Sequence, residues 1–188
     1  SLWPPCLRAE LLLSNAGRLI PRPRRGFNSA AHKGVWGSVA ASSKALGLDK
    51  EQTLNAFGIA GFMASGISEY SEEGSTSMME SLMGGWPSHS GVTASLLARE
   101  GLTGSRTILE DKWGYCRILA GDQEPHTEEL TKGLGQSFQI LEREIKPYAA
   151  WGGSHLCIDA VNALKHEHQV KPQDVEKVTV LCASRLYE

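Results

Sequence analysis

Histidine has the widest chemical range of the residues in this sequence, because its ring can bind a metal ion or transfer a proton near neutral pH. The six histidines are His32, His89, His126, His155, His166 and His168. A metal site needs converging ligands, such as two histidines four residues apart on a helix, and no pair here has that spacing. His166 and His168 would diverge on a helix, as is typical of a solvated helix end. We therefore expect no metal site, and a packing or capping role for His89.

Sequence motifs for nucleophilic and phosphate chemistry are missing. There is no Gly-x-Ser-x-Gly elbow, no P-loop and no Gly-x-Gly-x-x-Gly after a strand. The pair Gly84-Gly85 is followed by Trp86-Pro87, which is not a phosphate cradle. The four cysteines, Cys6, Cys116, Cys157 and Cys182, lie too far apart for a zinc ribbon or a disulfide scaffold, which favours a reducing compartment. The residue types alone predict an intracellular helical domain without a cofactor.

Composition excludes two classes of partner. The 188 residues include 19 Lys and Arg against 21 Asp and Glu, a formal net charge of −2, so the basic excess of a nucleic-acid-binding domain is missing. No apolar run approaches the roughly 18 residues that a membrane helix needs. With 41% hydrophobic and 21% charged residues, the chain has an ordinary globular composition. We therefore expect neither a nucleic acid nor a membrane as partner.

The elements that must position any site are mostly helices. We expect helices over residues 8–19, 34–46, 49–64, 88–99, 107–112, 127–145 and 155–165. In residues 34–46, Gly34, Gly37 and Ala41 share one face, where a neighbouring helix can approach closely. Asp49 with Gln52 forms a capping-box pattern, and Leu54, Phe57, Ile59 and Phe62 are expected to form the apolar stripe of the helix that follows.

Two segments are expected to depart from the helical pattern. Residues 66–87 are rich in Gly, Ser and Met and are expected to form a long loop with room for one turn of helix. The β-branched run from Val175 to Leu181 predicts a strand. Because a sheet needs partner strands, and because the first residue is not Met, we expect the chain to be part of a larger protein. Five arginines in residues 1–25 make a mitochondrial location the alternative to the cytoplasm.

Four collinear blocks carry a family resemblance. They are Arg25-Gly26-Phe27-Asn28 with the small-residue helix after it, Leu46 to Gly61, Gly91 to Gly104, and Lys146 to Ala160. In this order and spacing, they resemble the MmgE/PrpD family, which includes 2-methylcitrate dehydratase and cis-aconitate decarboxylase. The similarity covers roughly residues 7 to 188.

The resemblance implies a mainly α fold, with a helical domain, a smaller α+β lid domain and a homodimeric assembly. Residues 1–144 would form part of the helical domain, and residues 145–188 the beginning of the lid. The active site would lie between the domains and act on citrate-like di- or tricarboxylic acids without an iron–sulfur cluster. The family's N-terminal acidic motif, most of the lid and the C-terminal helical return have no counterpart here.

The resemblance also implies site residues near the boundary between the two domains. Removing a proton beside a carboxylate while a hydroxyl leaves requires a base and an acid, and cationic donors must hold the carboxylates. His155 is the expected catalytic residue, with Ser154, Lys146 and Tyr148 as substrate-binding residues. The alternatives are a structural Lys-Pro-Tyr at the domain junction and a His155 ring that only hydrogen-bonds the backbone at a helix start.

At three other aligned site positions the sequence departs from the family pattern. Asn28 stands where the family has a histidine, and an amide cannot act as a base near neutral pH. In the segment Glu80 to Gly85, Glu80 replaces a lysine and Met83 a histidine. A carboxylate there would repel a tricarboxylate: two like charges about 4 Å apart cost about 4 kcal/mol at an effective dielectric of about 20. The alternative is that Glu80 is a solvated loop residue.

Two functional hypotheses remain open from the sequence. One is a lyase, a hydro-lyase or carboxy-lyase of the resembling family, with an altered site and a citrate-like substrate. The other is a catalytically inactive relative that serves as a dimerising scaffold, because Asn28, Glu80 and Met83 all lack the expected chemistry.

Overall fold

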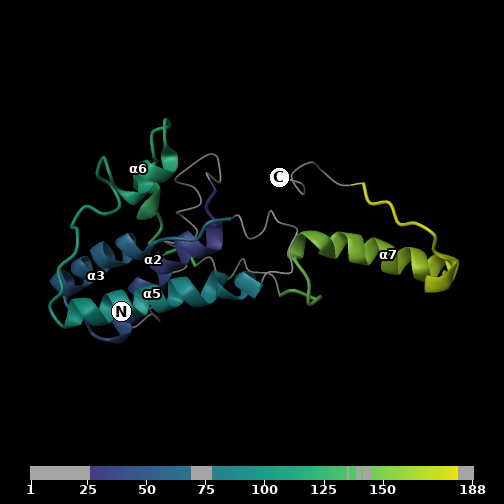
Figure 1. Ribbon diagram of the computed structural model, residues 1–188, viewed down its shortest axis with the longest axis horizontal. Coiled ribbons are helices and arrows are strands. Elements are labelled where there is room, and N and C mark those ends of the chain that lie inside the picture. Colours follow the sequence, from purple (N-terminus) through teal and green to yellow (C-terminus); the bar gives the residue numbers. More distant parts are fainter. Residues whose placement is uncertain (1–25, 69–77, 135, 139–140, 142–144, 182–188) are drawn as a thin grey trace. The chain divides into compact units, whose positions relative to one another are not determined.

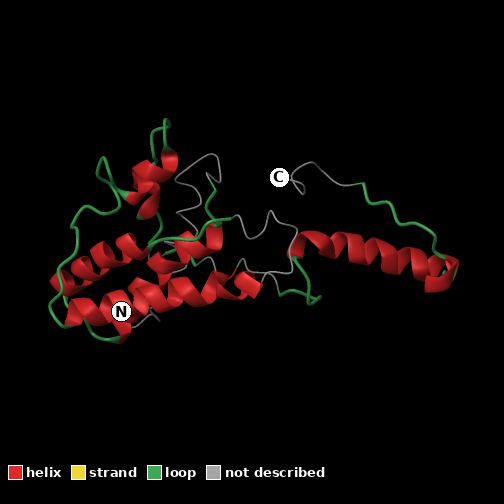
Figure 2. Cartoon of the chain, in the orientation of Figure 1, coloured by secondary structure: helices red, strands yellow, loops and turns green. Residues whose placement is uncertain are grey.

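The computed structural model describes residues 26–68, 78–134, 136–138, 141 and 145–181. The chain divides into two compact units, Ser1–Glu142 and Arg143–Glu188, and each is described by itself. The expected helix over residues 8–19 lies outside the described residues. Helices dominate the described part, which contains no strand (Figure 2). None of these helices is long and apolar enough to cross a membrane.

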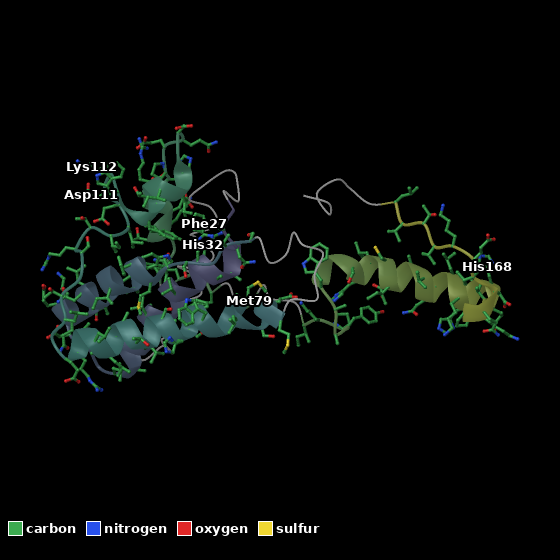
Figure 3. The ribbon with its side chains drawn as sticks, viewed as in Figure 1. Phe27, His32, Met79, Asp111, Lys112 and His168 are labelled. Atoms are coloured by element: carbon green, nitrogen blue, oxygen red, sulfur yellow. The ribbon has the colours of Figure 1, made fainter. Side chains whose placement is uncertain are left out.

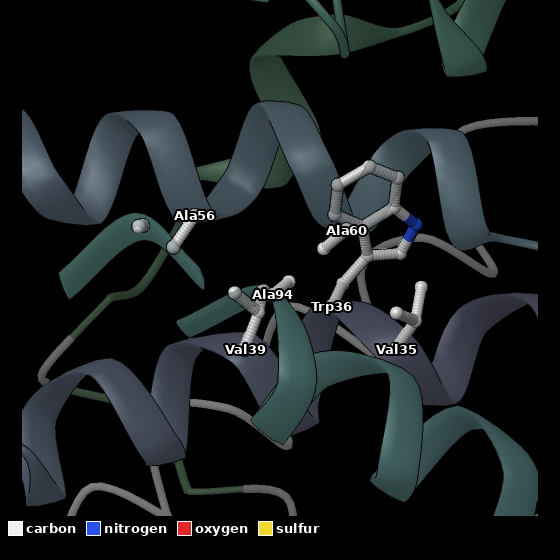
Figure 4. Close-up of a cluster of buried hydrophobic side chains, with 7 residues drawn as sticks. Val35, Trp36, Val39, Ala56, Ala60 and Ala94 are labelled. Carbon is white, nitrogen blue, oxygen red and sulfur yellow. The ribbon is translucent and has the colours of Figure 1, made fainter. Parts of the chain in front are cut away.

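The first unit is built around three packed helices. These are α2 (Ser29–Ala45), α3 (Lys50–Met63) and α5 (Leu82–Arg99) (Figure 1). The 3-10 turn η1 (Met78–Ser81) leads into α5, and the short helix α6 (Tyr115–Ala120) and the turn η2 (Thr127–Leu130) follow it. The packed helices supply one core cluster, consisting of Val35, Trp36, Val39, Ala56, Ala60, Ala94 and Ala98 (Figure 4). Alanine and valine predominate, so the helix backbones can approach closely.

Small residues decide how α2 and α5 meet. Gly91 of α5 lies directly on α2, and a Cβ built there would lie 2.5 Å from the backbone nitrogen of Val39. One turn further along α5, the Ser95 hydroxyl hydrogen-bonds those of Ser42 and Ser43 at 2.7 and 3.1 Å. These buried hydroxyls satisfy one another, so the contact avoids the cost of desolvated polar groups.

Helix α3 begins as the sequence predicts. The Asp49 carboxylate accepts a hydrogen bond from the Gln52 backbone nitrogen at 2.8 Å, and the Gln52 side chain accepts one from the Asp49 nitrogen at 3.1 Å. The predicted apolar stripe is wrong in one respect. Phe62 is 92% exposed, whereas Ala56 and Ala60 are fully buried. The small side chains face the core because α3 lies close to its neighbours.

Other helix predictions in the first unit are also wrong. The helix expected over 34–46 begins earlier, at Ser29. The helix expected from residue 88 begins at Leu82, so residues 82–87 are not part of a loop. Proline usually disrupts a helix interior, but Pro87 is the sixth residue of α5 and lies within the helix. It is buried, and a Cβ built on Gly34 of α2 would lie 3.0 Å from the Pro87 ring.

Residues 107–112 form turns instead of a helix, and the Thr107 hydroxyl donates to the Asp111 carboxylate at 3.1 Å. Such local side-chain hydrogen bonds compete with helix formation.

Towards the end of the first unit, the helix expected over 127–145 is absent from the described part of that range. The chain forms the turn η2 there and then further turns. Gly133 has a φ of +73°, which a right-handed helix cannot contain.

The second unit contains the helix α7 (His155–His168), preceded by the 3-10 turn η4 (Gly152–Ser154) and followed by η5 (Pro172–Asp174). The helix begins at the predicted residue, and every one of its side chains is exposed or half-buried. The predicted strand over 175–181 does not form. A strand is defined by its ladder of hydrogen bonds, and this segment pairs with no described residue.

Candidate active site

The segment between Lys146 and Asp159 contains the site residues that were expected just after the boundary between the two domains. After Pro147 the chain turns, and η4 leads directly into α7. The Ser154 hydroxyl donates to the carbonyl of Trp151 at 2.7 Å, and the Ser154 backbone nitrogen donates to the same carbonyl at 3.0 Å. Ser154 therefore stabilises the turn that precedes the helix, while its side chain makes no capping bond to α7.

Two nitrogen atoms converge on one backbone oxygen in this segment. The Ala150 carbonyl lies 3.2 Å from Nε2 of His155 and 3.4 Å from Nζ of Lys146. Because a carbonyl oxygen can only accept, Nε2 of His155 carries the proton, and Nδ1 of the neutral ring is left as the acceptor. The His155 ring thus makes the backbone hydrogen bond that the sequence left open as an alternative, with a fixed tautomer as the result.

Tyr148 connects the same segment to the next turn of α7. Its hydroxyl donates to Oδ1 of Asp159 at 2.5 Å, and its ring lies edge-on to that of His155 with the centroids 5.4 Å apart. The hydrogen bond to the Asp159 carboxylate raises the pKa of Tyr148 above its ordinary value. Sequence analysis did not select Asp159. The available signal was its spacing, since residues four apart share a helix face.

Asn28 has a structural role at the start of α2. Its side-chain oxygen accepts hydrogen bonds from the backbone nitrogens of Ala30 and Ala31, both at 3.0 Å. These two nitrogens belong to the first turn, where no helical carbonyl is available to accept from them. Asn28 is therefore the N-cap of α2, and asparagine is among the best residues for that position.

Removal of this cap is expected to destabilise the chain. Asn28→Ala should lower the free energy of unfolding by about 1 kcal/mol, because two first-turn N–H groups lose their acceptor. Asn28→Asp restores a side-chain oxygen and should stay within a few tenths of a kcal/mol of the unsubstituted chain. Urea unfolding followed by circular dichroism measures both, and equal stability of the two variants would exclude the capping role.

Glu80 and Met83 lie where the chain enters α5. Glu80 is exposed within η1, and Met83 is half-buried in the first turn of the helix. Both belong to the first unit, whereas Lys146, Tyr148, Ser154 and His155 belong to the second. No group of three potential metal ligands occurs among the described residues.

The sequence did not predict the polar pair of His32, which is buried, and Tyr115, which is half-buried. Nδ1 of His32 lies 2.5 Å from the Tyr115 hydroxyl and joins α2 to α6, and the Phe27 ring lies beside His32 (Figure 3). Burial, with a smaller contribution from Lys33, lowers the pKa of His32 to about 4, and burial raises the pKa of Tyr115. Both groups are thus neutral at pH 7, and a hydrogen bond between them needs only one shared proton. No local signal predicts a pair 83 residues apart.

Comparison with known proteins identifies the family of this chain. Residues 14–128 match the model of the MmgE/PrpD N-terminal domain, which is more than half of the chain. The chain belongs to the MmgE/PrpD family. The matched residues span the three packed helices with Asn28, Glu80 and Met83, and they end before Lys146.

Curated relatives agree with this MmgE/PrpD assignment. The cis-aconitate decarboxylase-like protein oryM of Aspergillus oryzae is 30% identical over 149 residues, which are 77% of this chain and 30% of that protein. A cis-aconitate decarboxylase of Aspergillus terreus is 27% identical over 148 residues, which are 76% of this chain and 30% of that protein. The chain thus spans about 30% of the length of these MmgE/PrpD relatives.

Proposed function

We propose that this protein is an MmgE/PrpD-type lyase that acts on a citrate-like di- or tricarboxylic acid through an altered site. The observation that carries the proposal is the convergence of Lys146 and His155 on the Ala150 carbonyl. A cation and a proton-transfer group beside each other are what removal of a proton next to a carboxylate requires. The relatives named as decarboxylases support the same substrate class.

Each group has a distinct role in the proposal. The Lys146 ammonium holds a substrate carboxylate, and its exposed position leaves it accessible to one. His155 takes up a proton at Nδ1, because its Nε2 proton is already engaged by the Ala150 carbonyl. Imidazole is the side chain that most readily exchanges a proton near neutral pH, which suits it to this step.

A non-catalytic relative is the second candidate function, and two observations in the first unit favour it. Asn28 uses its side-chain oxygen as a helix cap, where the family pattern has a histidine. Glu80 presents an exposed carboxylate where the pattern has a lysine. Asn28 supplies no base and Glu80 supplies no cation for a carboxylic-acid substrate, so a scaffold role would need no chemistry from them.

Thermal unfolding with and without millimolar citrate, cis-aconitate or 2-methylcitrate tests the proposal. A ligand that binds only the folded chain stabilises it by about 2.7 kcal/mol at a hundredfold excess over Kd. We expect one of the three acids to raise the unfolding temperature. We further expect Lys146→Met to abolish the increase, because the substrate carboxylate loses its cation.

Lys165→Met serves as the matched control, because it removes a similarly exposed lysine from α7 and should leave the response intact. A cooperative transition that none of the acids shifts would contradict the lyase proposal and favour the scaffold.

A further inference from the structure

Asp159 is a charged residue in contact with the proposed site, and it was not among the site residues expected from the resemblance. It lies in the second turn of α7, four residues after His155 and therefore on the same face of the helix. Its Oδ1 accepts the Tyr148 hydroxyl at 2.5 Å. A hydrogen bond to a carboxylate is stronger and more directional than one between neutral groups.

The contacts around Asp159 form a continuous chain. Asp159 holds the phenol of Tyr148, the Tyr148 ring lies edge-on to His155 with an interplanar angle of 77°, and Nε2 of His155 meets the Ala150 carbonyl. The phenol oxygen thus fixes one end of the tyrosine side chain, and the ring limits how the imidazole can rotate. Edge-on aromatic contacts are favourable because the positive ring edge meets the negative face.

We propose that Asp159 is a positioning residue: its carboxylate anchors Tyr148, and Tyr148 in turn holds the His155 imidazole in the orientation that leaves Nδ1 free. The catalytic meaning of this orientation rests on the proposed function, but the anchoring itself does not. The hydroxyl proton of Tyr148 is directed at Asp159, so the role of Tyr148 is its ring contact with the imidazole and not proton donation to substrate.

The anchoring predicts a coupled response of two rings to one carboxylate. The Asp159 carboxylate favours the protonated phenol, so Asp159→Asn should lower the pKa of Tyr148 towards its ordinary value. The amide of Asn162 acts in the opposite direction as a weaker influence and stays in place in this variant. If Tyr148 holds the imidazole, the same substitution should also change the environment of the His155 ring.

The experiment uses the full chain with 3-fluorotyrosine, whose phenol ionises at lower pH than that of tyrosine and whose fluorine resonance reports the ionisation. The histidines carry ring nitrogen-15. Tyr148→Phe and His155→Gln identify the two resonances. We expect Asp159→Asn to lower the ionisation midpoint of residue 148 and to shift the His155 ring nitrogens at neutral pH. Asp159→Glu should restore both in part, because it keeps the carboxylate.

Asp174→Asn is the matched control, because it removes an exposed carboxylate from η5 in the same unit and should change neither signal. If Asp159→Asn leaves the ionisation midpoint of residue 148 unchanged, the proposal is overturned, and an unchanged His155 ring overturns it as well. These readouts need no substrate. A positive result without any stabilisation by carboxylic acids would therefore keep Asp159 as a positioning residue and reject only the proposed function.

Discussion

Replacing Gly91 by alanine is expected to destabilise the chain by about 2 kcal/mol, which is typical of overpacking in a close contact. The added Cβ would lie 2.5 Å from the Val39 nitrogen and would also collide with the Ser38 side chain. The first of these atoms is helix backbone, which cannot rotate away as a side chain can. The two helices would have to separate, which would also stretch the hydrogen bonds between Ser95 and its two partners.

Gly84→Ala is the matched control in the same helix. A Cβ built on Gly84 meets nothing within 4 Å, so the alanine fits without strain. Alanine is preferred over glycine in a helix by roughly 0.5–1 kcal/mol, so this variant should be more stable than the unsubstituted chain. Urea unfolding followed by circular dichroism gives both values. A gain in stability for Gly91→Ala like that expected for Gly84→Ala would show that helix propensity, not close packing, governs this position.

The sequence predicted those parts of the fold that depend on neighbours along the chain. The capping box of Asp49 and Gln52 and the start of α7 at His155 are local patterns, and both are confirmed. Predictions that depended on packing did less well. Phe62 was expected in the apolar stripe of α3, yet the close approach of the helices buries Ala56 and Ala60 instead. Residue size at the point of contact decides which side chains face the core. A hydrophobicity pattern does not contain this information.

The candidate site shows the same division between local and distant information. Family resemblance directed attention to Lys146, Tyr148 and His155, and the structure brings them into one segment; their chemical roles stay a prediction. It also directed attention to Asn28, whose local geometry is that of a helix cap. The contact of His32 with Tyr115 could not be predicted, because it depends on how α6 lies against α2 and no spacing rule connects residues so far apart in sequence.

Mild acid is expected to destabilise the first unit through His32. Its pKa is about 4 in the folded chain and near 6.5 when unfolded, so the unfolded chain binds more protons between these values. The contribution of His32 to stability is therefore highest above pH 6.5 and falls as the pH decreases towards 4. The gap between the two pKa values corresponds to about 3 kcal/mol, a large fraction of the stability of a small domain.

The physical reason is that burial disfavours the charged imidazole of His32, and the Lys33 ammonium adds a smaller repulsion. His32 is 6% exposed, the neighbouring charge is the Lys33 ammonium, and Nδ1 is hydrogen-bonded to the Tyr115 hydroxyl. In the protonated ring both nitrogens donate, so the Tyr115 hydroxyl can only accept from Nδ1, and burial keeps that hydroxyl from ionising to compensate. Acid should thus weaken the contact of α6 with α2 before the helices themselves unfold.

His32→Gln isolates this effect from the titration of surface carboxylates. Glutamine keeps an acceptor for Tyr115 but cannot be protonated, so its free energy of unfolding should fall less between about pH 6.5 and 4.5 than that of the unsubstituted chain. Lost ring packing against Phe27 lowers its stability at every pH, which is why the slope and not the absolute value decides. His89→Gln, which replaces an exposed histidine of α5, should retain the original slope. Parallel slopes for the His32 variant and the unsubstituted chain would mean that the buried imidazole is protonated without cost, and the neutral pair of His32 and Tyr115 would not be what holds α6 in place.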